Sequence, residues 1–169
     1  MSFSMHSVVV RSNASMLRHA LVWLERAQVH ADAKKFDSAN YLTMRLAPDM
    51  LPFSTQVMIA CEIAKTGAAR VLGQESPKCE QVDTSLLHLR QRIEQALAYL
   101  DGLSPEQLDA AGAQSIVVPR RGQEALTFEC NDFVQCWSQP NFFFHATMMY
   151  ALLRHAGVEL GKADYLGIY

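Results

Sequence analysis

Several features are scarce in this 169-residue sequence, and each scarcity excludes a class of protein. Eight glycines and six prolines, in a chain that is 50% hydrophobic, exclude a disordered, collagen-like or low-complexity protein. Lys and Arg total 15 against 17 Asp and Glu, so the net charge is -2. A protein that binds nucleic acid normally carries a basic patch. None is visible here, and no nucleic-acid partner is expected.

No long apolar run and no signal-peptide pattern can be read in this sequence. Residues 1–15 lack a basic region followed by an apolar run, and no apolar run approaches the roughly 20 residues needed to cross a bilayer. The cysteines Cys61, Cys79, Cys130 and Cys136 form no C-x-x-C pair. We therefore expect reduced thiols in a cytoplasmic protein with no membrane contact.

Apolar residues instead recur at steps of three and four, the spacing of amphipathic helices. The pattern covers residues 4–31, 53–72, about 84–100 and 141–156. The broad stripe of the first stretch requires several partner helices. In the second stretch the inward residues are small, and Gly67 costs up to about 1 kcal/mol relative to alanine in a helix interior. Close packing against a neighbouring helix is the expected compensation.

The segments between these helices contain caps and breaks. Residues 36–52 predict a connector with one short helical turn, and Asp83 or Thr84 is expected to cap the third helix. Pro140 is expected to interrupt the last helical segment. The tail after Gly157, with two further glycines, predicts an extended strap over the bundle.

A change of pattern precedes the last helix. Residues 116–118 are β-branched, residues 119–122 can form a turn, and residues 125–128 can return as a second strand. The sequence therefore predicts an all-α fold. We expect a four-helix bundle with a small β-hairpin inserted before the last helix, in a single domain over residues 1–169.

His145 is the histidine with the clearest inward position, between Phe142 and Met149 on one helical face. Asn141 lies four residues earlier and shares that face. Two interpretations remain open: a core histidine satisfied by one hydrogen bond, or an amide and an imidazole that orient a ligand or form part of a weak metal site. The sequence contains no H-x-x-x-H spacing, no phosphate-binding glycine loop and no G-x-S-x-G motif.

The C-terminal third also carries a family resemblance. Residues 140–167, PNFFFHATMMYALLRHAGVELGKADYLG, resemble an uncharacterised bacterial family of domains of unknown function. That family is grouped with the DinB-like (YfiT-like) four-helix bundles. Residues 45–65 and the N-terminal helix support the resemblance, which therefore covers nearly the whole chain. It implies a bundle with one long crossover that is often dimeric.

DinB-like relatives often hold a divalent metal with three histidines, one from the second helix and two, four apart, from the last. By this resemblance His145 stands at the later position of that pair and Asn141 at the earlier one. The second helix has no histidine, and Gln56 is its polar residue expected to face the same pocket. Amide oxygens are poor ligands for zinc or nickel compared with imidazole. The expectation is no metal cofactor, and a polar pocket formed by Gln56, Asn141 and His145.

Three classes of function remain open for this sequence. The favoured one is a metal-free module that binds a small molecule or another protein through the polar pocket. The second is a metal-dependent hydrolase or thiol transferase of the DinB-like type. The third is a purely structural homodimer. The depleted ligand set and the lack of a visible pair of nucleophile and base favour the first class.

Excess apolar surface predicts self-association. Side chains of residues 142–144, three consecutive phenylalanines, point about 100° apart on a helix, so one core cannot easily receive all three rings. Val8, Val22 and Val29 lie outside the main apolar faces of the first helix. Exposed apolar patches usually mark interfaces. We expect a two-fold homodimer with helix faces, and not the hairpin, at its centre.

Overall fold

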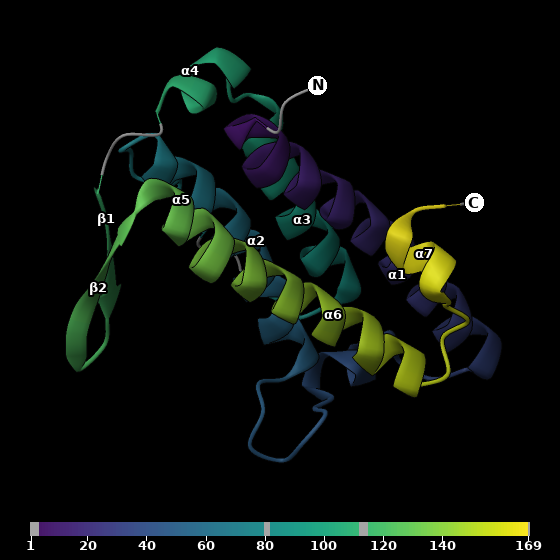
Figure 1. Ribbon diagram of the computed structural model, residues 1–169. Helices are drawn as coiled ribbons and strands as arrows, with labels where there is room; N and C mark the ends of the chain where they lie inside the picture. Colours follow the sequence, from purple (N-terminus) through teal and green to yellow (C-terminus); the bar gives the residue numbers. More distant parts are fainter. Residues whose placement is uncertain (1–3, 80–81, 112–114, 169) are drawn as a thin grey trace.

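The computed structural model describes residues 4–79, 82–111 and 115–168 (Figure 1). Four long helices form its body: α1 (Ser12–Lys34), α2 (Phe53–Val71), α3 (Leu86–Asp101) and α6 (Gln139–His155). Both α1 and α2 pack mainly on α3 and α6, so the helices form a ring with α1 and α2 at opposite corners. This confirms the predicted four-helix bundle. Among the described helices, none is long and apolar enough to cross a membrane.

The core fills the space inside this ring. Trp23, Phe53 and Phe142 are fully buried, and burial of a large apolar side chain contributes about 1.5–3 kcal/mol to stability. A methyl group added at Gly67 would come within 2.5 Å of Ser138 Oγ, so α2 and the helix containing Ser138 are in direct contact there. The predicted close packing at Gly67 is confirmed.

Two π-helical segments extend the helices at one end of the bundle. The segment η1 (Ser7–Arg11) leads into α1. The short helix α5 (Cys130–Asp132) and the segment η3 (Phe133–Ser138) lead into α6. Gln139 Nε2, in the first residue after η3, donates a hydrogen bond to the carbonyl of Val8 at 3.0 Å, which ties η1 to the start of α6.

The predicted interruption at Pro140 was wrong, because the helix runs through it. A proline ring clashes with the carbonyl four residues before it, which here belongs to Cys136. Cys136 lies within η3, where the π-helical turn is wider than an α-helical turn. The wider turn accommodates the ring.

The cap of α3 also differs from the prediction. Ser85, and not Asp83 or Thr84, is the N-cap, and its Oγ accepts a hydrogen bond from the N–H of His88 at 3.1 Å. Asp83 instead accepts a hydrogen bond from the Nε of Arg92, a buried arginine, at 2.7 Å. A carboxylate that faces a buried guanidinium is held by that charge and is not available to cap the helix.

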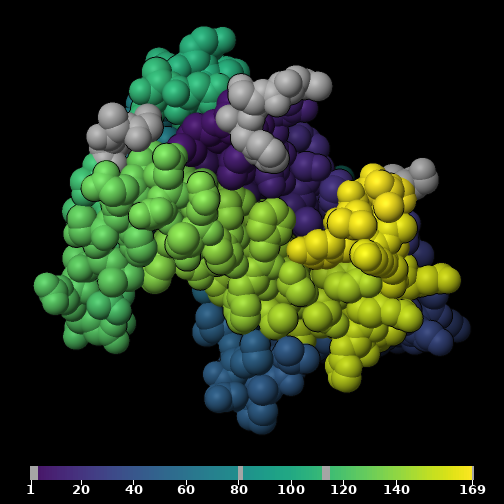
Figure 2. All heavy atoms as spheres, in the orientation of Figure 1, coloured from purple at the N-terminus to yellow at the C-terminus, as the bar shows by residue number. Residues whose placement is uncertain are grey.

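The segments that connect the long helices agree more closely with the prediction from the sequence. The link between α1 and α2 contains the 3-10 helix η2 (Ser38–Thr43), the predicted short turn. After α3 come α4 (Pro105–Ala110) and an antiparallel hairpin of β1 (Ser115–Arg120) and β2 (Gln123–Glu129). The predicted hairpin is confirmed, and Figure 2 shows it projecting from the body of the bundle.

The C-terminal tail contains a helix, α7 (Lys162–Leu166), where the sequence predicted an extended strap. Asp164 Oδ2 accepts a hydrogen bond from the Gly161 N–H at 2.7 Å and closes the first turn. Trp23 Nε1 donates to the Asp164 carbonyl at 3.1 Å, and the ring of Tyr165 stacks on Trp23 with centroids 5.7 Å apart. Contacts with α1, made by residues far away in sequence, therefore fix this helix.

Candidate functional site

Gln56 and His145 form a polar pair between α2 and α6. Gln56 lies in the first turn of α2, which begins directly after Pro52, and His145 lies on the inward face of α6. His145 Nδ1 is 2.6 Å from Gln56 Oε1, and the two residues are only 8% and 2% exposed. The structure thus brings together two of the three residues that the sequence assigned to one pocket.

The backbone carbonyl of Leu51 fixes the orientation of the Gln56 amide. Gln56 Nε2 donates a hydrogen bond to that carbonyl at 3.0 Å. A carbonyl can only accept, so the NH2 group must face Leu51 and the oxygen must face His145. The ring nitrogen opposite that oxygen must then be the donor, which places a proton on His145 Nδ1.

The second ring nitrogen of His145 is the chemically available atom of the pair. Burial lowers the pKa of His145 from its ordinary value of 6.5, so the ring is neutral at pH 7. In a neutral ring with Nδ1 protonated, Nε2 is a hydrogen-bond acceptor. Within the described residues no hydrogen bond is made to Nε2.

Asn141 and the apolar neighbours complete the surroundings. Asn141 lies one turn before His145 and is half-buried, but in the described parts of the chain its side chain makes no hydrogen bond to either residue of the pair. The ring of Phe144 meets the His145 ring edge-on, with centroids 5.2 Å apart, and Phe144 is 50% exposed. Leu51 is also exposed. The polar pair therefore lies beside apolar surface.

The residues of this site are a poor fit for the divalent metal that the DinB resemblance implies. One imidazole is present, its Nδ1 is occupied by Gln56, and the Gln56 NH2 group is held by Leu51. Zinc and nickel sites are normally built from imidazole, thiolate or carboxylate groups. Across the described ranges, no three His, Cys, Asp or Glu side chains gather as a metal site.

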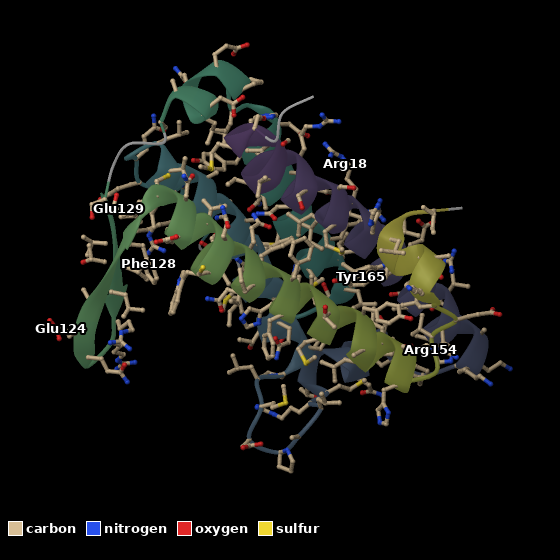
Figure 3. All side chains as sticks on the ribbon, in the orientation of Figure 1. Arg18, Glu124, Phe128, Glu129, Arg154 and Tyr165 are labelled. Carbon is tan, nitrogen blue, oxygen red and sulfur yellow. The ribbon has the colours of Figure 1, made fainter. Side chains whose placement is uncertain are left out.

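A separate hollow of about 1000 Å³ lies beside α1, away from the polar pair. Its walls are the outward face of α1 over residues 22–33, Arg154 at the end of α6, and residues 159–164. Figure 3 shows Arg154 at the end of α6, beside the C-terminal segment. No sequence pattern pointed to this hollow, although Val22 and Val29, which line it, were expected to lie outside the main apolar faces of the first helix.

Charged groups in the hollow are partly paired. Arg26 forms an ion pair with Asp164 at 2.9 Å and donates to the carbonyl of Glu159 at 3.0 Å. His30 Nδ1 lies 2.7 Å from the hydroxyl of Tyr41. Glu25 and Arg154 also line the hollow, and in the described part of the chain neither side chain has an ion-pair or hydrogen-bond partner.

Comparison with known proteins supports the fold and the resemblance. Residues 5–166 match a family described as a domain of unknown function (DUF1993). The crystal structure of a DinB family member protein from Shewanella denitrificans is similar to this chain, with 39% sequence identity and a TM-score of 0.87. The similarity covers 96% of this chain and 91% of that one. The search of curated proteins gave no match.

Proposed function

The chain belongs to the DUF1993 family and has the fold of a DinB family member, and from this premise we propose that it is a metal-free helical bundle that binds a ligand at the polar pair Gln56–His145. The hydrogen bond between Gln56 Oε1 and His145 Nδ1 supports this proposal. Through this hydrogen bond the Gln56 amide orients the His145 imidazole, and Nε2 of that ring is left as an acceptor. A metal-dependent enzyme would need more ligands than this pair supplies.

The ligand class follows from the surroundings of Nε2. A neutral imidazole nitrogen accepts a hydrogen bond from an O–H or N–H group. The half-exposed ring of Phe144, which contacts the His145 ring, favours an apolar body, and ligand sites generally combine apolar walls with a few placed polar groups. The expected ligand is an apolar small molecule, or an apolar side chain of a partner protein, that carries one hydrogen-bond donor.

The first prediction concerns metal content. Protein purified without added metal should carry well under one equivalent of zinc or nickel by elemental analysis, because His145 is the only imidazole of the pair. A matched control is His155→Ala, which removes an exposed histidine from the end of the same helix. Near-stoichiometric metal that is lost in His145→Ala but kept in His155→Ala would contradict the proposal and favour the hydrolase or transferase.

The ligand class is tested with phenol, an aromatic ring with one O–H donor. In protein labelled with 15N-histidine, long-range proton–nitrogen correlation distinguishes Nδ1–H from the unprotonated Nε2. Phenol should move the Nε2 resonance of His145 and leave His155 unchanged, and Phe144→Ala should weaken the shift. A His145 ring protonated on Nε2 in the free protein, or a phenol response equal at both histidines, would count against the site.

Self-association is a second part of the proposal, favoured by exposed apolar side chains on the helices. Of the phenylalanine run, Phe142 is fully buried and Phe144 is half-exposed, while Val29 of α1 is 63% exposed. Such surface is usually covered by a partner, and the two-fold dimer is the commonest closed assembly. Sedimentation equilibrium at micromolar concentration should report a dimer, and a monomer at every concentration would contradict this part.

A further inference from the structure

The outward face of α1 has the shape of a ridge between two hollows. Val22, Glu25 and Val29 line the hollow of about 1000 Å³ beside the C-terminal segment. Glu25 and Val29 also line a second hollow, of about 250 Å³, on the side of α3. We call these three residues the α1 ridge. A ridge beside a groove is complementary to a second copy of itself, because helices pack ridges into grooves.

Exposed apolar side chains lie on the α1 ridge and beside it. Val29 is 63% exposed, and Leu87 of α3, across the smaller hollow, is 60% exposed. Below them, the buried residues Leu24 and Leu86 form part of the walls of the same hollow. The exposed residues are therefore continuous with the core between α1 and α3 and are not scattered singly over the surface.

The charges of this surface are complementary between copies. Glu25 stands on the ridge and Arg154 on the far wall of the larger hollow, and in the described residues neither has a partner of opposite charge. The neighbouring Arg26 is already paired with Asp164 at 2.9 Å. One unpaired acid on the ridge and one unpaired base in the groove suit a two-fold contact, in which each pair forms twice.

We propose that the α1 ridge and the hollows beside it form the contact surface of the homodimer, and this inference rests on the self-association proposed above. Two α1 helices cross in an antiparallel sense with the two-fold axis near Val29. The ridge of each copy enters the larger hollow of the other, and Glu25 pairs with the partner's Arg154. Val29 packs against its own counterpart at the centre.

Charge reversal gives the decisive test, carried out on the full-length chain by sedimentation equilibrium. Glu25→Arg and Arg154→Glu each place like charges opposite one another twice in a homodimer, and each should raise the dimer dissociation constant at least about tenfold. Mixing the two variants should restore dimerisation, because the mixed dimer has an opposite pair at both contacts. The double variant should also dimerise. Restoration in the mixture should fade in 1 M salt, where the screening length is about 3 Å.

Two apolar substitutions complete the experiment. Val29→Glu should abolish the dimer, and Val117→Glu, at an exposed valine on the hairpin, should leave it unchanged. Helical circular dichroism and thermal melting confirm that each variant is folded. A monomeric wild-type protein would overturn the proposed homodimer itself. A wild-type dimer that survives Val29→Glu, or charge variants whose mixture shows no restoration, would overturn this surface and leave the homodimer standing.

Discussion

At the scale of single residues, the Gln56 amide has two different partners, and this explains why a glutamine suits the position. Its oxygen accepts from His145 and its NH2 group donates to the Leu51 carbonyl. A carboxylate cannot donate to that carbonyl, and an apolar side chain can do neither. The amide thus links the loop before α2 to α6 through buried hydrogen bonds, and each bond can be tested by substitution.

Gln56→Leu should lower the free energy of unfolding by about 1–3 kcal/mol, because it leaves the imidazole N–H and the Leu51 carbonyl without their partner. Urea unfolding followed by circular dichroism measures the loss. In a His145→Leu background the same change should cost less, since no imidazole remains to lose its acceptor. Equal costs in the two backgrounds would show that the hydrogen bond contributes nothing.

Stability should fall with decreasing pH because of His145. Burial lowers the pKa of His145 from 6.5 in the folded state, so below that value the unfolded chain binds the proton more readily. The folded state is therefore destabilised as pH falls below 6.5 and through the folded pKa. His145→Asn keeps a donor toward Gln56 without a titrating ring. Urea unfolding at pH 7.5 and 5.5 should show a smaller drop in this variant, and equal drops would contradict the assignment.

At the scale of helices and strands, local sequence predicts most of the boundaries. Pro52 precedes α2, and Gly157, with a φ of 93°, ends α6 where the sequence indicated a stop. The π-helical segments were not predicted, because their geometry depends on contacts between residues far apart. Gln139 reaches Val8 across 131 residues of sequence. The helix in the tail was also not predicted, because it is held in place by a contact with Trp23, which is far away in sequence.

The same limit applies to the candidate site. The periodicity of α6 placed His145 inward, and it is buried. Its contact with Gln56 joins residues 89 apart, and only the family resemblance suggested it. The proton on Nδ1 follows from the Leu51 carbonyl, whose position no local pattern encodes. A pocket that also includes Asn141 stays a prediction.

Packing between α2 and the segment before α6 predicts that alanine at position 67 lowers the stability of the protein, although alanine normally stabilises a helix interior relative to glycine. Gly67→Ala should gain up to about 1 kcal/mol in helix propensity. The new methyl group, however, would lie 2.5 Å from Ser138 Oγ, and overpacking costs about 1–3 kcal/mol. The variant should therefore be less stable than the wild type by chemical denaturation.

Removing the hydroxyl of Ser138 should reverse this effect. In a Ser138→Ala background the added methyl would meet the Cβ of residue 138 at 3.7 Å, an ordinary contact distance. Gly67→Ala should then stabilise the protein relative to Ser138→Ala alone. If alanine at position 67 destabilises both backgrounds equally, the contact with Ser138 is not the reason for the glycine.

At the scale of the whole molecule, the four helices enclose one continuous core, and Cys61 lies inside it. Burial raises the pKa of the Cys61 thiol to about 12, although nearby Arg92 acts in the opposite direction. A thiol reacts as its thiolate, so Cys61 is protected both by enclosure and by protonation. Its reaction with an alkylating reagent therefore requires opening of the bundle and reports on the stability of the whole fold.

This gives a prediction for two single-cysteine variants, one keeping Cys61 and the other keeping the exposed Cys136, with the remaining cysteines changed to serine. At pH 8 iodoacetamide should label Cys61 at least about 10³-fold more slowly than Cys136, because a domain with several kcal/mol of stability is rarely open. Adding Gly67→Ala should speed labelling of Cys61 about tenfold for each 1.4 kcal/mol of stability lost, and leave Cys136 unchanged. Comparable labelling of both thiols in the native protein would mean that α2 opens locally, without the rest of the bundle, and that the four helices do not unfold as one unit.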